Sequence, residues 1–209
     1  MYGITDLYLF IIAGLLLNIT PGADMLYILT NSFQKGFRAG VVATIGISTG
    51  CLFHVFLAVI GLSALLQSSE FAFTIVKYLG VIYLVYLGIS MIFSKNKEVK
   101  VDKSYKGRED LKKIFLNGVL INSLNPKVAI FFITFLPQFI DVHSDNKSMG
   151  LLILGLVFIL FGTLSNIFLS YIALHISTKV SYANKLTKYI KKIVGAFFIG
   201  FGIKLALEK

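Results

Sequence analysis

The chain has 209 residues, of which 56% are hydrophobic and only 14% are charged. A soluble domain of this length has about 25% charged residues, so the composition excludes a single soluble core and favours a polytopic membrane protein. The net charge of +10 comes from basic residues in short segments between apolar runs. This pattern is typical of cytoplasmic loops, and it leaves no polar domain for binding nucleic acid.

The sequence offers little material for metal or redox chemistry. Cys51 is the only cysteine, and the three histidines are scattered, so we expect no cofactor and no metal site. An enzyme is also disfavoured, because aspartyl chemistry needs two close acids and Asp24 is the one acid deep in an apolar run. Residues 1–6 lack the basic flank of a signal peptide, so we expect the first apolar run to be retained.

Six apolar runs are long enough to cross a bilayer, which takes about 20 residues. Of the 20 Lys and Arg residues, fifteen follow the first, third and fifth runs, four lie on the opposite side, and Lys127 lies inside the fourth run. The positive-inside rule then places the basic loops in the cytoplasm and both termini outside the cytoplasmic (inner) membrane. We therefore predict an all-α membrane protein with six transmembrane helices, at residues 5–31, 41–66, 70–93, 114–140, 149–175 and 191–208.

A basic linker at 94–113 separates a first half, 1–93, from a second half, 114–209, and the halves resemble each other weakly. Pro21 and Pro126 lie 105 residues apart, in the first and fourth runs. A unit of three spans ends on the side opposite its start, so the second copy must be inverted. Inverted repeats place a binding site at their interface, between discontinuous helices. We predict two inverted three-helix repeats, with helices 1 and 4 broken.

Thr20-Pro21-Gly22 and Asn125-Pro126 have the pattern of a helix start, in which a capping residue precedes a proline at the first helical position. We expect two helices to begin there at mid-depth, where free N–H groups and partial positive charge favour a carboxylate. The alternative is a pair of structural proline kinks repaired by neighbouring helices. Two breaks at equivalent positions, each flanked by asparagine and a charge, favour a functional role.

The charges beside the breaks are Asp24 and Lys127. A charge facing lipid at the centre of a helix costs about 2.5–3.5 kcal/mol on insertion scales, so we expect both side chains to face protein or water. Asp24 is the candidate for binding an ammonium group and for accepting a proton; the alternative is an Asp24–Lys127 pair that only locks the two halves. The predicted substrate-binding residues are Asn18, Thr20, Pro21, Gly22, Asp24, Asn122, Asn125, Pro126, Lys127 and Asn166.

The second run carries small residues at helical spacing. Gly46 and Gly50 have the spacing that lets two helices approach closely, so we predict a packing role, although Ser48 and Thr49 between them could line a path. His54 follows one turn later. A single histidine on an apolar span is more often a packed, hydrogen-bonded residue than a proton relay, and we predict the former.

At these residues the chain resembles the LysE family of amino acid exporters, particularly its RhtB-type homoserine, threonine and leucine exporters. Residues 18–50 and 124–140 are similar to the signatures of the family's first and fourth spans, and residues 77–88 and the end of the chain also fit. The resemblance covers essentially the full length. It implies a six-helix exporter driven by proton motive force, in which Pro21, Gly22, Asp24, Asn125, Pro126 and Lys127 are functional. One departure is Ala23, where many relatives have a second proline.

We therefore predict a secondary transporter that exports an amino acid or a close derivative by proton antiport and alternating access. The substrate carboxylate would rest on the two helix starts near Gly22 and Lys127, and its ammonium would meet Asp24. The alternatives are a carrier of a metal ion or another small organic molecule, and a non-transporting membrane assembly subunit. The expected partners are the amino acid, protons and the lipid bilayer, and a homo-oligomer is possible.

Overall fold

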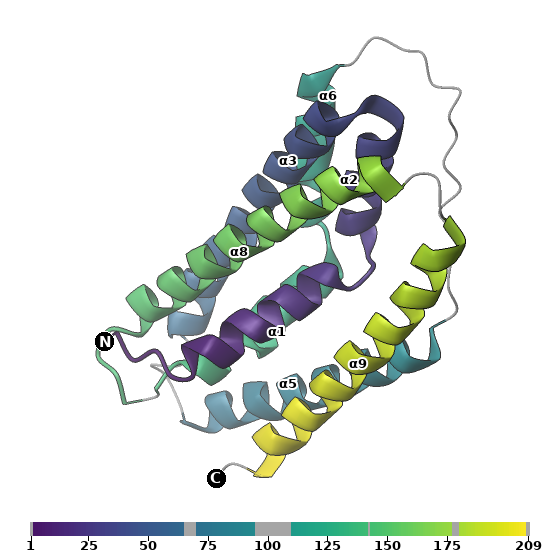
Figure 1. Cartoon of the computed structure of the whole chain (residues 1–209). Helices are drawn as coiled ribbons and strands as arrows, with labels where there is room; N and C mark the ends of the chain where they lie inside the picture. Colours follow the sequence, from purple (N-terminus) through teal and green to yellow (C-terminus); the bar gives the residue numbers. More distant parts are fainter. Residues whose placement is uncertain (1, 65–69, 95–109, 142, 177–179, 208–209) are drawn as a thin grey trace.

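The computed structural model of the chain is a bundle of helices (Figure 1). It describes residues 2–64, 70–94, 110–141, 143–176 and 180–207. In chain order its elements are α1 (Leu7–Ile19), α2 (Ala23–Lys35), α3 (Phe37–Leu57), the π-helix η1 (Ala58–Leu62), α5 (Glu70–Phe93), α6 (Leu111–Ser123), α7 (Pro126–Thr134), the 3-10 helix η2 (Leu136–Phe139), α8 (Lys147–Ile176) and α9 (Val180–Leu207). Within these ranges, all regular structure is helical apart from one isolated bridge between Ile4 and Ile140.

Several of these helices are long and apolar enough to cross a membrane. Three pass this test alone, at Phe37–Leu62, Thr74–Phe93 and Lys147–Ala173. Two further pairs pass it only together, because each helix alone is too short to cross; α1 and α2 are bent by 58°, and α6 and the α7–η2 segment by 48°. The described residues thus hold three to five candidate spans, which confirms an all-α membrane protein. The sixth span and the inverted repeat stay predictions.

Large apolar side chains cover the outer faces of these helices. Phe56 on α3, Tyr86 on α5 and Phe168 on α8 are each more than 60% exposed. A soluble monomer rarely exposes contiguous apolar surface of this kind, whereas a bilayer covers it without cost. The exposed faces are therefore those of a protein that lies in lipid.

Glycines bring the helix backbones close together at two contacts. A Cβ atom added to Gly50 of α3 would lie 2.5 Å from the carbonyl oxygen of Val119 on α6, and one added to Gly46 would meet the carbonyl of Phe115. On the other side of the molecule, a Cβ on Gly88 of α5 would lie 2.5 Å from the carbonyl oxygen of Gly195 on α9. Any side chain at these positions would push the paired helices apart.

The chain ends lie at one end of the bundle (Figure 1). The Thr5 N–H donates to the Phe139 carbonyl at 2.9 Å, and Asp6 forms an ion pair with Lys204 at 3.8 Å. The α2–α3 turn and the start of α6 lie at the opposite end. Lys35 and Arg38 flank that turn, so the basic segments that the structure describes gather away from the termini.

Two clusters of buried apolar residues lie on either side of the helix breaks. The larger includes Phe10 and Leu17 of α1 and Phe131 of α7, together with residues of α8 and α9. The smaller contains Ile28 of α2 and Ile114 of α6, with three residues of α3. Because the breaks separate α1 from α2 and α6 from α7, they fall between the two apolar layers. The fold thus places open backbone in the interior of the bundle.

Candidate functional site

The first break differs from the predicted helix start. Thr20 is extended, with φ −68° and ψ 121°, as a residue before proline tends to be. Its hydroxyl donates to the Leu16 carbonyl at 2.7 Å, so the prediction that Thr20 caps the next helix is wrong. Pro21 is not the first helical residue either, because Gly22 is also extended and α2 begins at Ala23. Ala23 thus occupies the first helical position of α2.

The N-terminus of α2 is open. Its N-cap is Gly22, which supplies no side chain to cap the helix. In the part of the chain that the structure describes, no group accepts a hydrogen bond from the backbone N–H of Ala23, Asp24 or Met25. Free donors of this kind carry partial positive charge. The first break therefore presents a set of backbone donors whose chemistry suits an anion.

The second break is capped. Asn125 is the N-cap of α7, its Oδ1 accepts from the Lys127 N–H at 3.0 Å, and Pro126 stands at the first helical position, as predicted. The Asn125 carbonyl accepts from the N–H groups of Val128 and Ala129, both at 3.1 Å. Since proline has no N–H, no donor remains free at this helix start. In this conformation the second helix start therefore has no free backbone donor for the substrate carboxylate that we expected it to bind.

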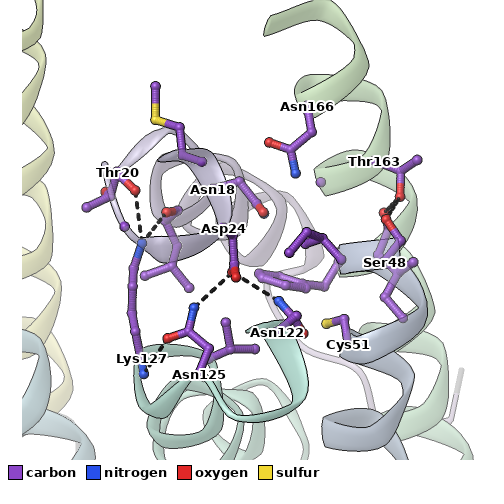
Figure 2. A pocket seen from close by; sticks show the side chains of 18 residues that line it. Asn18, Thr20, Asp24, Ser48, Cys51, Asn122, Asn125, Lys127, Thr163 and Asn166 are labelled. Carbon is purple, nitrogen blue, oxygen red and sulfur yellow. Dashed lines mark hydrogen bonds between the residues drawn. The ribbon is translucent and has the colours of Figure 1, made fainter. Parts of the chain in front are cut away.

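Asp24 connects the two breaks. Its Oδ2 accepts hydrogen bonds from the side-chain amides of Asn122, at 3.0 Å, and Asn125, at 2.9 Å (Figure 2). Its other oxygen, Oδ1, is buried and has no partner among the residues that the structure describes. A buried carboxylate oxygen without a partner is costly. One half of this carboxylate is therefore fixed by the second half of the chain, and the other half is available to a ligand.

Lys127 does not pair with Asp24. Its Nζ donates to the backbone carbonyls of Leu17 at 2.9 Å and Thr20 at 3.1 Å, at the end of α1. The ion pair found among the described residues is that of Asp6 with Lys204. The predicted alternative of a direct Asp24–Lys127 lock is therefore not what the structure shows.

His54 supports the second break from α3. It is buried, and its Nε2 lies 2.9 Å from the Asn122 carbonyl oxygen. A carbonyl can only accept, so Nε2 carries the proton in this bond. The same carbonyl accepts from the Asn125 N–H at 2.9 Å. His54 is thus a packed, hydrogen-bonded residue, as the sequence predicted, and it helps to hold the residue that donates to Asp24.

These groups surround one cavity (Figure 2). Its lining comes from both breaks and from α1, α2, α3, α6, α7 and α8. Pro21 and Pro126 do not line it and act by shaping the breaks, and Gly46 and Gly50 lie at the α3–α6 contact instead. Eight of the ten predicted binding residues line the cavity: Asn18, Thr20, Gly22, Asp24, Asn122, Asn125, Lys127 and Asn166.

The wall opposite the breaks combines polar and apolar side chains. The hydroxyls of Ser48 on α3 and Thr163 on α8 are hydrogen-bonded to each other at 2.6 Å, and Ile47, Phe158 and Ile159 add apolar surface. We did not predict Thr163. Thr163 precedes Asn166 by three residues, which places both on one helix face. The prediction that Asn166 lines the site could therefore have been extended to Thr163.

The cavity is narrow in this conformation. Its volume is about 30 Å³, measured as the space open to the centre of a water molecule, which is room for about two waters. Any amino acid is larger than this. A ligand of that size needs the surrounding helices to move apart before it can reach Asp24.

Comparisons with known proteins place the chain in a family. The model of the LysE type translocator family matches residues 15–209. YrhP, an uncharacterized membrane protein of Bacillus subtilis, is 34% identical over 91% of this chain and 93% of its own length. The leucine efflux protein of Salmonella typhimurium is 30% identical over 98% of this chain and 96% of its own, and that of an Enterobacter strain is 29% identical over 98% and 97%. No solved structure matches the chain.

Proposed function

The chain belongs to the LysE type translocator family, and we propose that it exports an amino acid or a close derivative across the cytoplasmic membrane. Members of this family are transporters and not enzymes, and two of the relatives are leucine efflux proteins. The observation that carries the proposal is the pairing of a buried, half-free carboxylate with an open helix N-terminus at one break. Together they offer one negative and one positive partner at the same depth.

The two partners match the two charges of an amino acid. The ammonium group of the substrate binds Oδ1 of Asp24, while Asn122 and Asn125 hold Oδ2 and so fix the direction of the carboxylate. The substrate carboxylate binds the backbone donors at the start of α2, next to Gly22. The apolar wall of Ile47, Phe158 and Ile159 faces the substrate side chain. All the charge recognition then comes from the first break, and the second break supports it.

Transport proceeds by alternating access. The cavity is too small for an amino acid in this conformation, so binding requires helices to separate and release requires them to separate on the other side. The breaks are suited to this movement, because short extended segments at element ends can absorb changes in φ and ψ. Thr20 and Gly22 are two such positions.

Proton antiport supplies the driving force in this proposal. A proton that reaches Asp24 from outside neutralises the carboxylate, which releases the ammonium group and lets the empty carrier return. A lower external pH then accelerates export, because it favours protonation on the side of release. Efflux into media of different pH tests this. The efflux rate of the wild type should rise as the external pH falls. An efflux rate that does not change with external pH would show that export is not coupled to protons.

We further propose six spans arranged as two inverted three-helix repeats, at 1–93 and 114–209, joined by a basic cytoplasmic linker at 94–113. The support is the packing of each half on the broken helix of the other half. The second span of the first half, α3, packs on α6, and the second span of the other half, α8, packs on α1. The basic ends lie away from the termini, which favours both termini outside. Accessibility of a terminal tag in intact cells tests this, and a tag reached only after permeabilisation would overturn the orientation.

Efflux from cells loaded with dipeptides tests the proposed function. Cells that express the protein and hydrolyse an imported dipeptide should export the released amino acid faster than cells without it. Asp24→Asn should lower the rate to background, because the amide cannot neutralise an ammonium group. Asp145→Asn, at an exposed loop position, is the matched control and should export normally. Wild-type efflux from the Asp24→Asn cells would remove Asp24 from the mechanism.

A further inference from the structure

The ammonium group of Lys127 lies in a cradle of backbone carbonyls at the end of α1. Its Nζ donates to the carbonyl oxygens of Leu17 at 2.9 Å and Thr20 at 3.1 Å. The Leu17 carbonyl also accepts from the Thr20 N–H at 3.1 Å, and the carbonyls at a helix C-terminus together carry partial negative charge. The cradle therefore has the chemistry of a site for a small cation, and a side chain from α7 fills it (Figure 2).

The cation and its cradle come from different broken helices. In transporters built from discontinuous helices, unwound carbonyls and the C-terminal ends of half-helices coordinate the coupling ion. We propose that Lys127 is a tethered cation that permanently occupies such an ion site. The protein then needs no sodium or other inorganic cation at this break, and the ammonium of Lys127 is a partner of α1 and not of the substrate carboxylate.

The surroundings of Lys127 hold it in this role. Its backbone N–H is bound by Asn125 Oδ1, and its carbonyl accepts from the Tyr83 hydroxyl at 3.1 Å. With the backbone fixed on both sides, the side chain reaches past Gly22, where an added Cβ would lie 3.7 Å from Lys127 Cδ and Nζ. The ammonium group of Lys127 thus lies against the first break beside Gly22, which has no side chain.

Removing the lysine side chain should leave a cradle that a free cation can enter. Lys127→Ala takes the donor away from the Thr20 carbonyl, which is otherwise without a partner in the described structure, and opens space beside the cavity that Lys127 lines. Ethylammonium is a suitable probe, since it carries the same NH₃⁺ group on a short stem. Tetraethylammonium has the same charge but no N–H, so it is the matched control ion.

Thermal unfolding of the purified proteins tests the cradle directly. Ethylammonium should raise the Tm of Lys127→Ala by binding the folded state, and it should leave the wild type and Lys112→Ala, an exposed lysine variant, unchanged. Tetraethylammonium should have no effect on any of them. Equal shifts in all three proteins, or none in Lys127→Ala, would overturn the proposal. If Lys127→Ala folds poorly, its folded yield with and without ethylammonium is measured instead, and a yield that ethylammonium does not raise also contradicts the tethered cation.

Transport assays test the consequence for coupling, and this part rests on the proposed function. In proteoliposomes, wild-type exchange of amino acid should be unchanged, within about twofold, when choline replaces sodium. Exchange by Lys127→Ala should fall about tenfold, the loss expected when a charged hydrogen bond is removed, and ethylammonium should restore at least about a third of it. A strict sodium requirement in the wild type would refute the proposal. The Tm measurement does not depend on which solute is carried, so it distinguishes a failure of the cradle from a failure of the exporter assignment.

Discussion

The two helix breaks have similar sequences and different chemistry. At the first break the N-cap is Gly22, which leaves the donors of α2 free, whereas at the second break Asn125 caps α7 and uses its donors. The first break keeps a half-free carboxylate, and the second supplies the asparagines that hold its other oxygen. Two copies of a repeated motif can therefore differ in role: the first break has groups free to bind a ligand, and the second break holds the Asp24 carboxylate in place.

This division explains why the second break needs more contacts than the first. Asn122 and Asn125 donate to Asp24, His54 and the Asn125 N–H both bind the Asn122 carbonyl, and Tyr83 binds Lys127. A carboxylate that is to recognise an ammonium group must be held in one direction before the substrate arrives. The contacts around α7 provide this fixed support, while the first break stays free to change shape.

Of three changes around the breaks, replacing Asn125 should lower transport the most. Asn125→Ala removes a hydrogen bond to a carboxylate, worth about 1.5–3 kcal/mol, and a helix cap, worth about 1 kcal/mol. Asn125→Ser keeps a capping hydroxyl but cannot reach Asp24 as an amide does. We expect transport to fall about 10- to 100-fold in both variants, and the Tm to fall further in Asn125→Ala. Transport by Asn125→Ser at the wild-type rate would show that the bond to Asp24 is unimportant.

Giving the first break a cap should have the next largest effect. In Gly22→Asn, the new side chain can accept from the free donors of α2 and so compete with the substrate carboxylate. We expect the KM for the exported amino acid to rise about tenfold, with the Tm unchanged or slightly higher.

Gly22→Ala is the control for this change. Its Cβ would make an ordinary contact, at 3.7 Å, with Lys127, the extended backbone accepts any residue, and alanine cannot cap. Its KM should stay close to that of the wild type. Equal KM values for the Asn and Ala variants would show that the open N-terminus does not bind the carboxylate.

Changing His54 should have the smallest effect of the three. The Asn122 carbonyl keeps its bond from the Asn125 N–H when the histidine is lost, so the cost is that of one net hydrogen bond, about 0.5–1.5 kcal/mol. We expect His54→Gln to slow efflux about threefold and to leave its dependence on external pH intact. If the variant lost the pH dependence altogether, His54 would be a proton relay and not a support.

The sequence predicted the positions of both breaks but only one of the two helix starts. Asn125-Pro126 behaves as local rules require, because the side chain of Asn125 caps the helix that Pro126 begins. Thr20-Pro21 has the same pattern, yet the Thr20 hydroxyl bonds back to Leu16 and Gly22 stays extended. A local pattern cannot decide between a hydroxyl that caps forward and one that bonds backward, and the glycine permits two further residues of open chain.

Most of the polar side chains that line the cavity were predicted, while their hydrogen-bond partners were not. Polar residues in apolar spans are costly, so Asn18, Asp24 and Asn166 were visible in the sequence, and the structure places all three on the cavity. The partners of Lys127 could not be predicted from the sequence, because they are two backbone carbonyls, which every residue has. The apolar wall was also hidden, because Phe158 does not differ from the many lipid-facing phenylalanines of the chain.

Competition by analogues with a single charge tests the central claim, that the first break binds both charges of an amino acid. The purified protein in proteoliposomes would exchange the amino acid identified by efflux, with its amide, which keeps only the ammonium, and its deaminated acid, which keeps only the carboxylate, as competitors. We expect the unlabelled amino acid to compete fully and each analogue to compete at least about tenfold more weakly, because each loses a charged hydrogen-bonding partner. Competition by either analogue as strong as that of the amino acid would contradict the account.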